Sequence, residues 1–144
     1  MLGRAAREKD RMPRLKVIFI VDDDPVSRRL IARLLVRPGW SFRLFADAQE
    51  AWKAMDDLLP DLVISALCIP GVDGLTFLAA VGDRAPTVHT ILVSGADMPP
   101  AAHRALRDGR IDALAAKPVD AMLVGMARQL LDEPAADDWL SEAG

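Results

Sequence analysis

The stretch Leu15-Lys16-Val17-Ile18-Phe19-Ile20-Val21-Asp22-Asp23-Asp24-Pro25 decides how this chain of 144 residues folds. Its first part is an apolar run, rich in β-branched side chains, with the length and composition of a buried strand. Three carboxylates follow, and Asp24-Pro25 favours a helix start, because aspartate accepts free backbone N–H groups and proline suits the first helical position. The stretch therefore predicts a buried strand that ends in acidic side chains and leads directly into a helix.

Outward from this stretch, apolar strand patterns alternate with helical patterns, and turn residues such as Pro38-Gly39 separate them. We expect strands at 15–21, 40–45, 61–65, 88–93 and 111–115, and helices at 25–37, 47–59, 75–81, 99–108 and 120–131. This alternation predicts an α/β fold with a five-stranded parallel sheet covered by helices on both faces. Right-handed crossovers favour the flavodoxin-like, doubly wound (βα)5 arrangement with strand order 2-1-3-4-5.

The composition indicates one globular domain, at 15–131, between two charged ends. We expect 1–14 to be a disordered basic extension rather than a nucleic-acid-binding arm, and 132–144 to be an acidic tail carrying Trp139-Leu140. No apolar run approaches the roughly 20 residues of a membrane span, and no signal peptide is evident. The single cysteine, Cys68, suits a reducing compartment, so we expect a cytoplasmic protein without membrane contact.

In a doubly wound sheet, ligands bind outside the carboxyl ends of the strands. Asp22 and Asp23 follow the first strand, and carboxylate oxygens suit Mg²⁺. Ser94 follows the fourth strand, although Ser-Gly is also ordinary turn chemistry. Lys117-Pro118 follows the fifth strand, and the proline favours an extended lysine. These residues predict a site for a metal or an anion at one edge of the sheet.

Four motifs, in this order, resemble the receiver domain of two-component response regulators: Val21-Asp22-Asp23, Pro70-Gly71-Val72-Asp73-Gly74, Ser94 and Lys117-Pro118. The resemblance covers about 15–131. It implies that Asp22, Asp23 and the backbone carbonyl of Cys68 hold Mg²⁺, and that Ser94 and Lys117 contact phosphoryl oxygens. It also implies that an aspartate at the end of the third strand, four residues before Pro70, accepts a phosphoryl group from a histidine kinase.

The chain departs from this family at two positions. The acceptor position is Ala66, and a methyl group cannot attack phosphorus, so we expect no catalytic residue there. Leu114 stands at the switching position of the fifth strand, where the family has an aromatic residue. We do not expect Ser65 or Asp73 to substitute for the acceptor. Ser65 turns to the opposite face of its strand and Asp73 lies beyond the loop, whereas in-line transfer depends on close positioning.

The missing carboxylate leaves two alternatives for the site. Asp22 and Asp23 bind Mg²⁺ more weakly than an intact triad would, or Lys117 forms a permanent ion pair with one of them and fills the site without metal. No cofactor is required in either case.

The leading functional hypothesis is a stand-alone signalling module, a pseudo-receiver, that acts by protein–protein interaction without aspartyl phosphorylation. The partner would be a histidine kinase, another signalling protein or a second copy of the chain, bound through the face formed by 99–131. A basic rim with flexible methionines suits such a partner. The candidates are His103, Arg104, Arg107, Arg110, Met122 and Met126. The two methionines also have the spacing of a helical core.

Two other hypotheses remain. The chain could be an ordinary phosphorylatable receiver whose acceptor aspartate has been replaced by alanine. An independent enzyme is not expected, because no nucleophile–base pair, phosphate loop or metal-ligand spacing occurs elsewhere in the sequence.

Overall fold

Five parallel strands form one sheet in the order β2-β1-β3-β4-β5, which confirms the predicted architecture. The computed structural model describes residues 14–95 and 97–131, so the expectations for the basic extension and the acidic tail lie outside the described residues, apart from Arg14. The elements are β1 (Lys16–Val21), α2 (Pro25–Leu35), β2 (Trp40–Phe45), α3 (Ala48–Ala54), β3 (Leu62–Ala66), α4 (Gly74–Arg84), β4 (His89–Ser94), α5 (Pro100–Arg107), β5 (Ala113–Ala116) and α6 (Ala121–Leu130).

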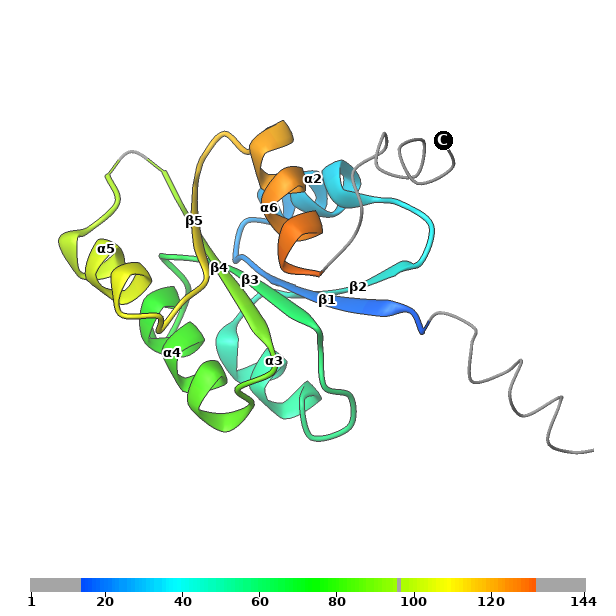
Figure 1. Cartoon of the computed structure of the whole chain (residues 1–144), viewed down its shortest axis with the longest axis horizontal. Coiled ribbons are helices and arrows are strands. Elements are labelled where there is room, and N and C mark those ends of the chain that lie inside the picture. Colours follow the sequence, from blue (N-terminus) through cyan, green and yellow to red (C-terminus); the bar gives the residue numbers. More distant parts are fainter. Residues whose placement is uncertain (1–13, 96, 132–144) are drawn as a thin grey trace, which may run out of the picture.

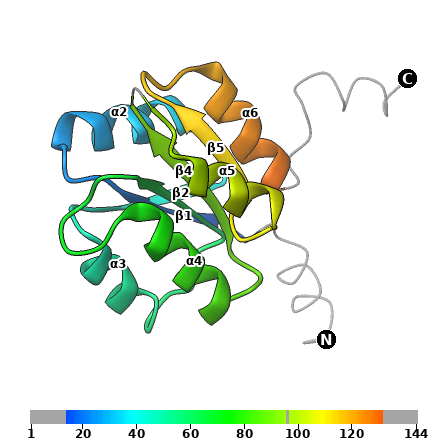
Figure 2. The same cartoon turned by 90° about the vertical axis from the view of Figure 1, so that its left-hand side faces the viewer.

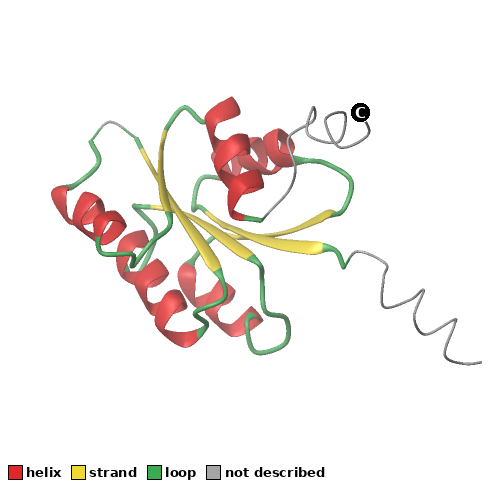
Figure 3. Cartoon of the chain, in the orientation of Figure 1, coloured by secondary structure: helices red, strands yellow, loops and turns green. Residues whose placement is uncertain are grey.

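Helices cover both faces of the sheet (Figures 1 and 2). Alternate residues of β1 enter two separate core clusters: Phe19 packs on the side of α3, α4 and α5, and Ile20 packs on the side of α2 and α6. Both side chains are fully buried, as expected for a central strand of a parallel sheet. Figure 3 shows the resulting three layers, with the strands between the helices.

Aspartates begin four of the helices. Asp24 accepts a backbone N–H bond at the position predicted from the sequence, and Asp47, Asp73 and Asp120 do the same for α3, α4 and α6. Each carboxylate satisfies one of the N–H groups that a helix start leaves without a partner. Among the described residues, no helix has the length and apolarity needed to cross a membrane.

Four predicted boundaries were wrong by more than one residue. Helix α2 ends at Leu35 instead of continuing to Arg37, because Pro38 disfavours helical geometry in the residue before it. Helix α4 continues past Gly82 to Arg84, because Phe77, Leu78 and Val81 bury one face of it. Helix α3 ends at Ala54, and the chain then passes through turns instead of continuing to Leu59. Strand β5 begins at Ala113 rather than Ile111.

Candidate functional site at the carboxyl ends of the strands

Backbone hydrogen bonds join the residues that follow the strands at one edge of the sheet. The N–H of Asp22 donates to Phe45 (3.1 Å), that of Leu67 to Val93 (2.9 Å), and that of Lys117 to Ser94 (2.8 Å). These bonds extend the sheet by one residue and bring the predicted site residues to the same edge. The Lys117–Pro118 peptide bond is cis.

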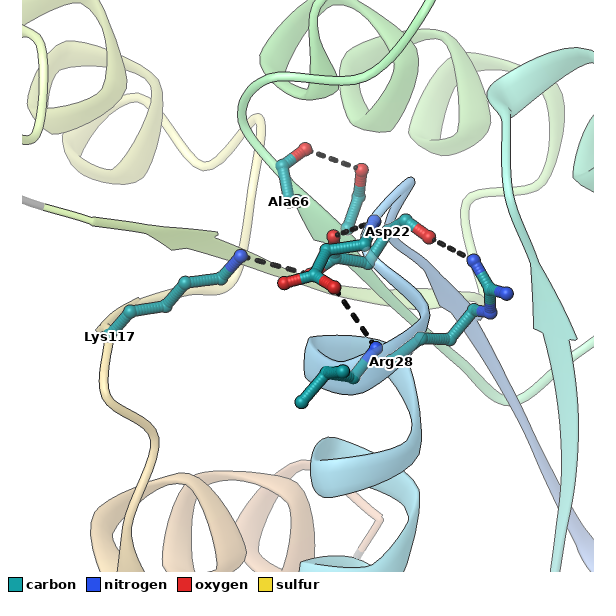
Figure 4. Close-up of polar contacts among 7 residues, drawn as sticks. Asp22, Arg28, Ala66 and Lys117 are labelled. Carbon is teal, nitrogen blue, oxygen red and sulfur yellow. Dashed lines mark hydrogen bonds and ion pairs between the residues drawn. The ribbon is translucent and has the colours of Figure 1, made fainter.

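Asp22 is the buried centre of this edge, with 1% of its surface exposed. Its Oδ2 accepts a hydrogen bond from Nζ of Lys117 at 2.9 Å, and its Oδ1 accepts one from the N–H of Asp24 at 3.0 Å. Figure 4 shows Lys117 reaching Asp22 from the loop after β5, with Ala66 on another side of the carboxylate. The structure therefore contains the predicted ion pair, with Asp22 rather than Asp23 as the partner of Lys117.

Arg28 is a further member of the site, which the sequence analysis missed. It extends from α2, and its Nη1 donates to the backbone carbonyl of Asp22 at 2.5 Å (Figure 4). Arg28 follows the helix cap Asp24 by four residues, so it lies one turn into α2. That position is the only signal in the sequence, and it does not tell which group the guanidinium meets.

Asp23 is not part of this ion pair. It is exposed and lines a hollow of about 760 Å³ together with Cys68, between the loop after β3 and the start of α5. The residues predicted as metal ligands are thus divided, with Asp22 engaged by Lys117 and with Asp23 and Cys68 in the hollow.

The oxygen atoms available at this edge do not fit a resident Mg²⁺ ion while Lys117 is bound to Asp22. Both carboxylate oxygens of Asp22 already accept hydrogen bonds, and Ala66 offers no oxygen in its side chain. No group of three His, Cys, Asp or Glu side chains converges anywhere in 14–95 and 97–131. One exposed carboxylate and one carbonyl remain, the low end of the one or two carboxylates, supplemented by phosphate oxygens, through which proteins usually bind Mg²⁺.

Two glycines and Asp73 determine the backbone conformation of the loop from Ala66 to Gly74. Gly71 has a φ of +89°, a conformation that favours glycine. A Cβ on Gly74 would lie 1.9 Å from the carbonyl oxygen of Ala66, so only glycine lets α4 approach the end of β3 this closely. The backbone around position 66 is therefore fixed by residues other than the one at position 66.

Neither of the two possible substitutes for the acceptor is placed to act as one. Ser65 is fully buried, its hydroxyl donates to the carbonyl of Ala66, and it lies on the α4 side, 2.9 Å from a Cβ built on Gly74. The carboxylate of Asp73 accepts hydrogen bonds from both N–H and Oγ1 of Thr76. The methyl group of Ala66 is left at the acceptor position, 4% exposed.

Ser94 and Leu114 occupy the positions that the sequence analysis assigned to the phosphoryl contact and the switch. Ser94 is buried at the end of β4. Leu114 is half-buried on β5 and packs against the cluster beneath α3, α4 and α5. These placements agree with the predicted positions and leave the roles as predictions.

The candidate interface residues are all on the surface except Met126. Arg104 and Arg110 line a hollow between α4 and α5, where Arg110 lies 3.7 Å from Asp83. His103 and Arg107 are exposed on α5. Met122 is 69% exposed, whereas Met126 is half-buried and packs against the core, as one reading of its spacing predicted.

Comparisons with known proteins agree with this geometry. The model of the response regulator receiver domain matches residues 18–125. The chain is similar to the DNA-binding transcriptional regulator NtrC of Proteus hauseri, with 32% identity over 103 residues. It is also similar to the C4-dicarboxylate transport transcriptional regulatory protein DctD of Rhizobium meliloti, with 34% identity over 113 residues. These alignments cover 72% and 78% of this chain but 22% and 24% of the relatives, so the chain spans less than a quarter of their length.

A solved structure gives the same result. The signal receiver domain of an HD domain-containing protein from Pseudomonas fluorescens Pf-5 superposes with a TM-score of 0.76 and 30% sequence identity, covering 83% of this chain and 96% of that one. The family model spans most of the sequence, and the chain therefore belongs to the response regulator receiver domain family.

Proposed function

We propose that this receiver domain signals through protein–protein contacts without being phosphorylated on an aspartate. The observation that carries the proposal is Ala66 at the acceptor position, on a backbone that Gly71, Asp73 and Gly74 hold in place. A phosphoryl acceptor needs a nucleophilic oxygen within bonding distance of the donor. The methyl group supplies none, and the nearby hydroxyl of Ser65 and carboxylate of Asp73 are engaged elsewhere.

The ion pair gives the domain one resting state instead of a switch. In the proposed mechanism, Lys117 neutralises Asp22 and ties the loop after β5 to the end of β1. A side chain exposed by 31% and a carboxylate exposed by 1% form a partly buried pair, which is screened less by salt than a surface pair. The site then requires neither metal nor phosphoryl group to keep its shape, and Mg²⁺ binds weakly at most.

The proposed partner is a histidine kinase or another signalling protein in the cytoplasm, and the domain acts without enzymatic activity. The DNA binding named for NtrC belongs to a protein of which this chain covers 22%, so the partner proposed here is a protein rather than DNA. A second copy of the chain, bound through the face of α5, β5 and α6, is included in this proposal.

The test compares the wild type with Ala66→Asp after incubation with acetyl phosphate and Mg²⁺, followed by intact-mass measurement. We expect no phosphoryl adduct on the wild type. An acid-stable or acid-labile adduct on the wild type would refute the proposal, because it would reveal an acceptor other than an aspartate at position 66.

The same experiment separates a second candidate, an ordinary receiver in which alanine has replaced the acceptor. The loop geometry favours this candidate, since Gly74 leaves the end of β3 in place whatever residue stands at position 66. If Ala66→Asp is phosphorylated as readily as an ordinary receiver, the rest of the pocket is competent. If Ala66→Asp folds and stays unmodified, the second candidate is excluded.

A further inference from the structure

The outer face of α2 combines exposed apolar side chains with positive charge. Val26 is 74% exposed and Leu30 is 47% exposed, and they are four residues apart, so they adjoin on one face of the helix. Arg29 and Arg33 are exposed beside them. Single exposed apolar residues are ordinary, but adjacent ones on a helix without any acidic residue favour an acidic occupant with apolar side chains.

The chain leaves the described fold next to this face. Helices α2 and α6 lie side by side on the same face of the sheet (Figures 1 and 2). Both follow a strand at its carboxyl end and run back along the sheet, so they point in the same direction. Leu131, directly after α6, shares a core cluster with Leu35 at the end of α2. The described chain therefore ends, at Leu131, beside the end of α2 that is farther from Asp22.

The segment 132–144 has the chemistry that this face would bind. It contains the acidic residues Asp132, Glu133, Asp137, Asp138 and Glu142, no basic residue, and the apolar pair Trp139-Leu140. Trp139 is eight residue steps beyond Leu131, a reach of up to about 26 Å at about 3.3 Å per residue. Helix α2 has 11 residues and is about 16 Å long, so Trp139 can reach any point along it.

We propose that the segment 132–144 docks on the outer face of α2 within the same chain. Trp139-Leu140 covers Val26 and Leu30, and the acidic residues pair with Arg29 and Arg33. The docked segment would lie next to the helix start that carries Asp24 and close to the Lys117–Asp22 ion pair. It therefore competes with any protein that binds this side of the domain, so that release of the segment regulates binding of the partner.

The apolar hollow between α3 and α4 is the main competing site for Trp139-Leu140. It has a volume of about 490 Å³ and includes Trp52 and Phe77. However, it lies on the opposite face of the sheet from α6, and none of the described residues in its lining is basic. Proximity, and the pairing available to Arg29 and Arg33, favour α2.

The test uses the full chain with labelled leucine and valine methyl groups, observed by NMR at low salt. The double variant Trp139→Ala/Leu140→Ala should shift the methyl resonances of Val26 and Leu30 and leave those of Leu59 and Val72, exposed on the other side of the sheet, in place. The charge-reversal variant Arg29→Glu/Arg33→Glu should release the segment, so the methyl resonances of Leu30 should shift in the same direction as in the tail variant. The matched control Arg43→Glu/Lys53→Glu, which changes two other exposed basic residues, should leave these resonances in place.

Three results would overturn this proposal. The first is that the methyl resonances of Val26 and Leu30 do not move in the tail variant. The second is that the resonances near Trp52 shift more than those of α2. The third is a shift that disappears on dilution, which would show that the segment binds a second copy. Raising the ionic strength to about 1 M, where charges interact over only about 3 Å, should weaken the effect of the tail variant.

Discussion

Replacing Lys117 with methionine tests the energetic role of the ion pair. Lys117→Met keeps an apolar chain of similar length and removes the ammonium group. The carboxylate of Asp22, 1% exposed, then keeps a hydrogen bond only from the N–H of Asp24. Removing one partner of a fully buried pair costs about 3–5 kcal/mol, because the remaining charge is left uncompensated. Since Lys117 is 31% exposed and water reaches part of the pair, we expect a loss of about 2–3 kcal/mol.

The reverse substitution should cost less. Asp22→Asn retains an acceptor for the N–H of Asp24, and the partly exposed ammonium of Lys117 can turn toward water. We therefore expect a loss of about 1 kcal/mol in the free energy of unfolding. This asymmetry follows from the difference in burial between the two partners, and a surface ion pair would not produce it.

The assay is urea unfolding followed by far-UV circular dichroism, with the slope of the transition compared among variants. Lys53→Met is the matched control, since Lys53 is exposed on α3 and its side chain has no recorded partner among the described residues. Its effect should stay within about 0.5 kcal/mol. The reasoning fails if Lys117→Met costs no more than Lys53→Met, or if Asp22→Asn costs as much as Lys117→Met.

Three further predictions concern the metal, the glycines and a helix cap. Isothermal titration of the wild type with Mg²⁺ should show no sub-millimolar binding, and Lys117→Met, which frees Asp22, should bind Mg²⁺ more tightly; sub-millimolar binding by the wild type would contradict the self-neutralised site. Gly74→Ala should destabilise the fold by about 3 kcal/mol or more in urea unfolding, because its Cβ would lie 1.9 Å from the Ala66 carbonyl. The control Gly125→Ala, in α6 with no atom within 4 Å of the added Cβ, should stabilise by up to about 1 kcal/mol, and equal effects of the two would refute the close-approach argument. Asp73→Ala should cost about 1 kcal/mol, since it removes the cap that accepts from Thr76, and a loss below the error of the unfolding curve would count against that role.

The fold was predictable because its signals are local. Asp24-Pro25 starts a helix, and that helix ends at Leu35, three residues before the Pro38-Gly39 turn that the sequence offered as its stop. The full burial of β1 on both faces follows from an uninterrupted apolar run, and that burial places β1 inside the sheet. Position 66 was located through the resemblance to receiver domains, in which the acceptor lies four residues before the loop proline, here Pro70.

The contacts of the site were less predictable because they depend on rotation of whole elements. The sequence left open whether Lys117 meets Asp22 or Asp23, because adjacent residues point in different directions only once the backbone after β1 is set. The direction of Arg104 is set by Ala102 and Ala105, which bury the inner side of α5 and turn Arg104 toward α4. Small residues of this kind give a weak pattern in the sequence, so the sequence did not indicate that Arg104 faces α4.

The most direct test of the central claim is a backbone amide spectrum of the wild type recorded with beryllofluoride and Mg²⁺, a stable substitute for a phosphoryl group. Ala66→Asp, under the same conditions, is the positive control. With no acceptor at position 66 and with Lys117 held by Asp22, the amide signals of Ser94 and Lys117 should stay in place in the wild type. A shift of these signals in the wild type, spreading to β5 and α5, would contradict the claim that this receiver domain signals without phosphorylation.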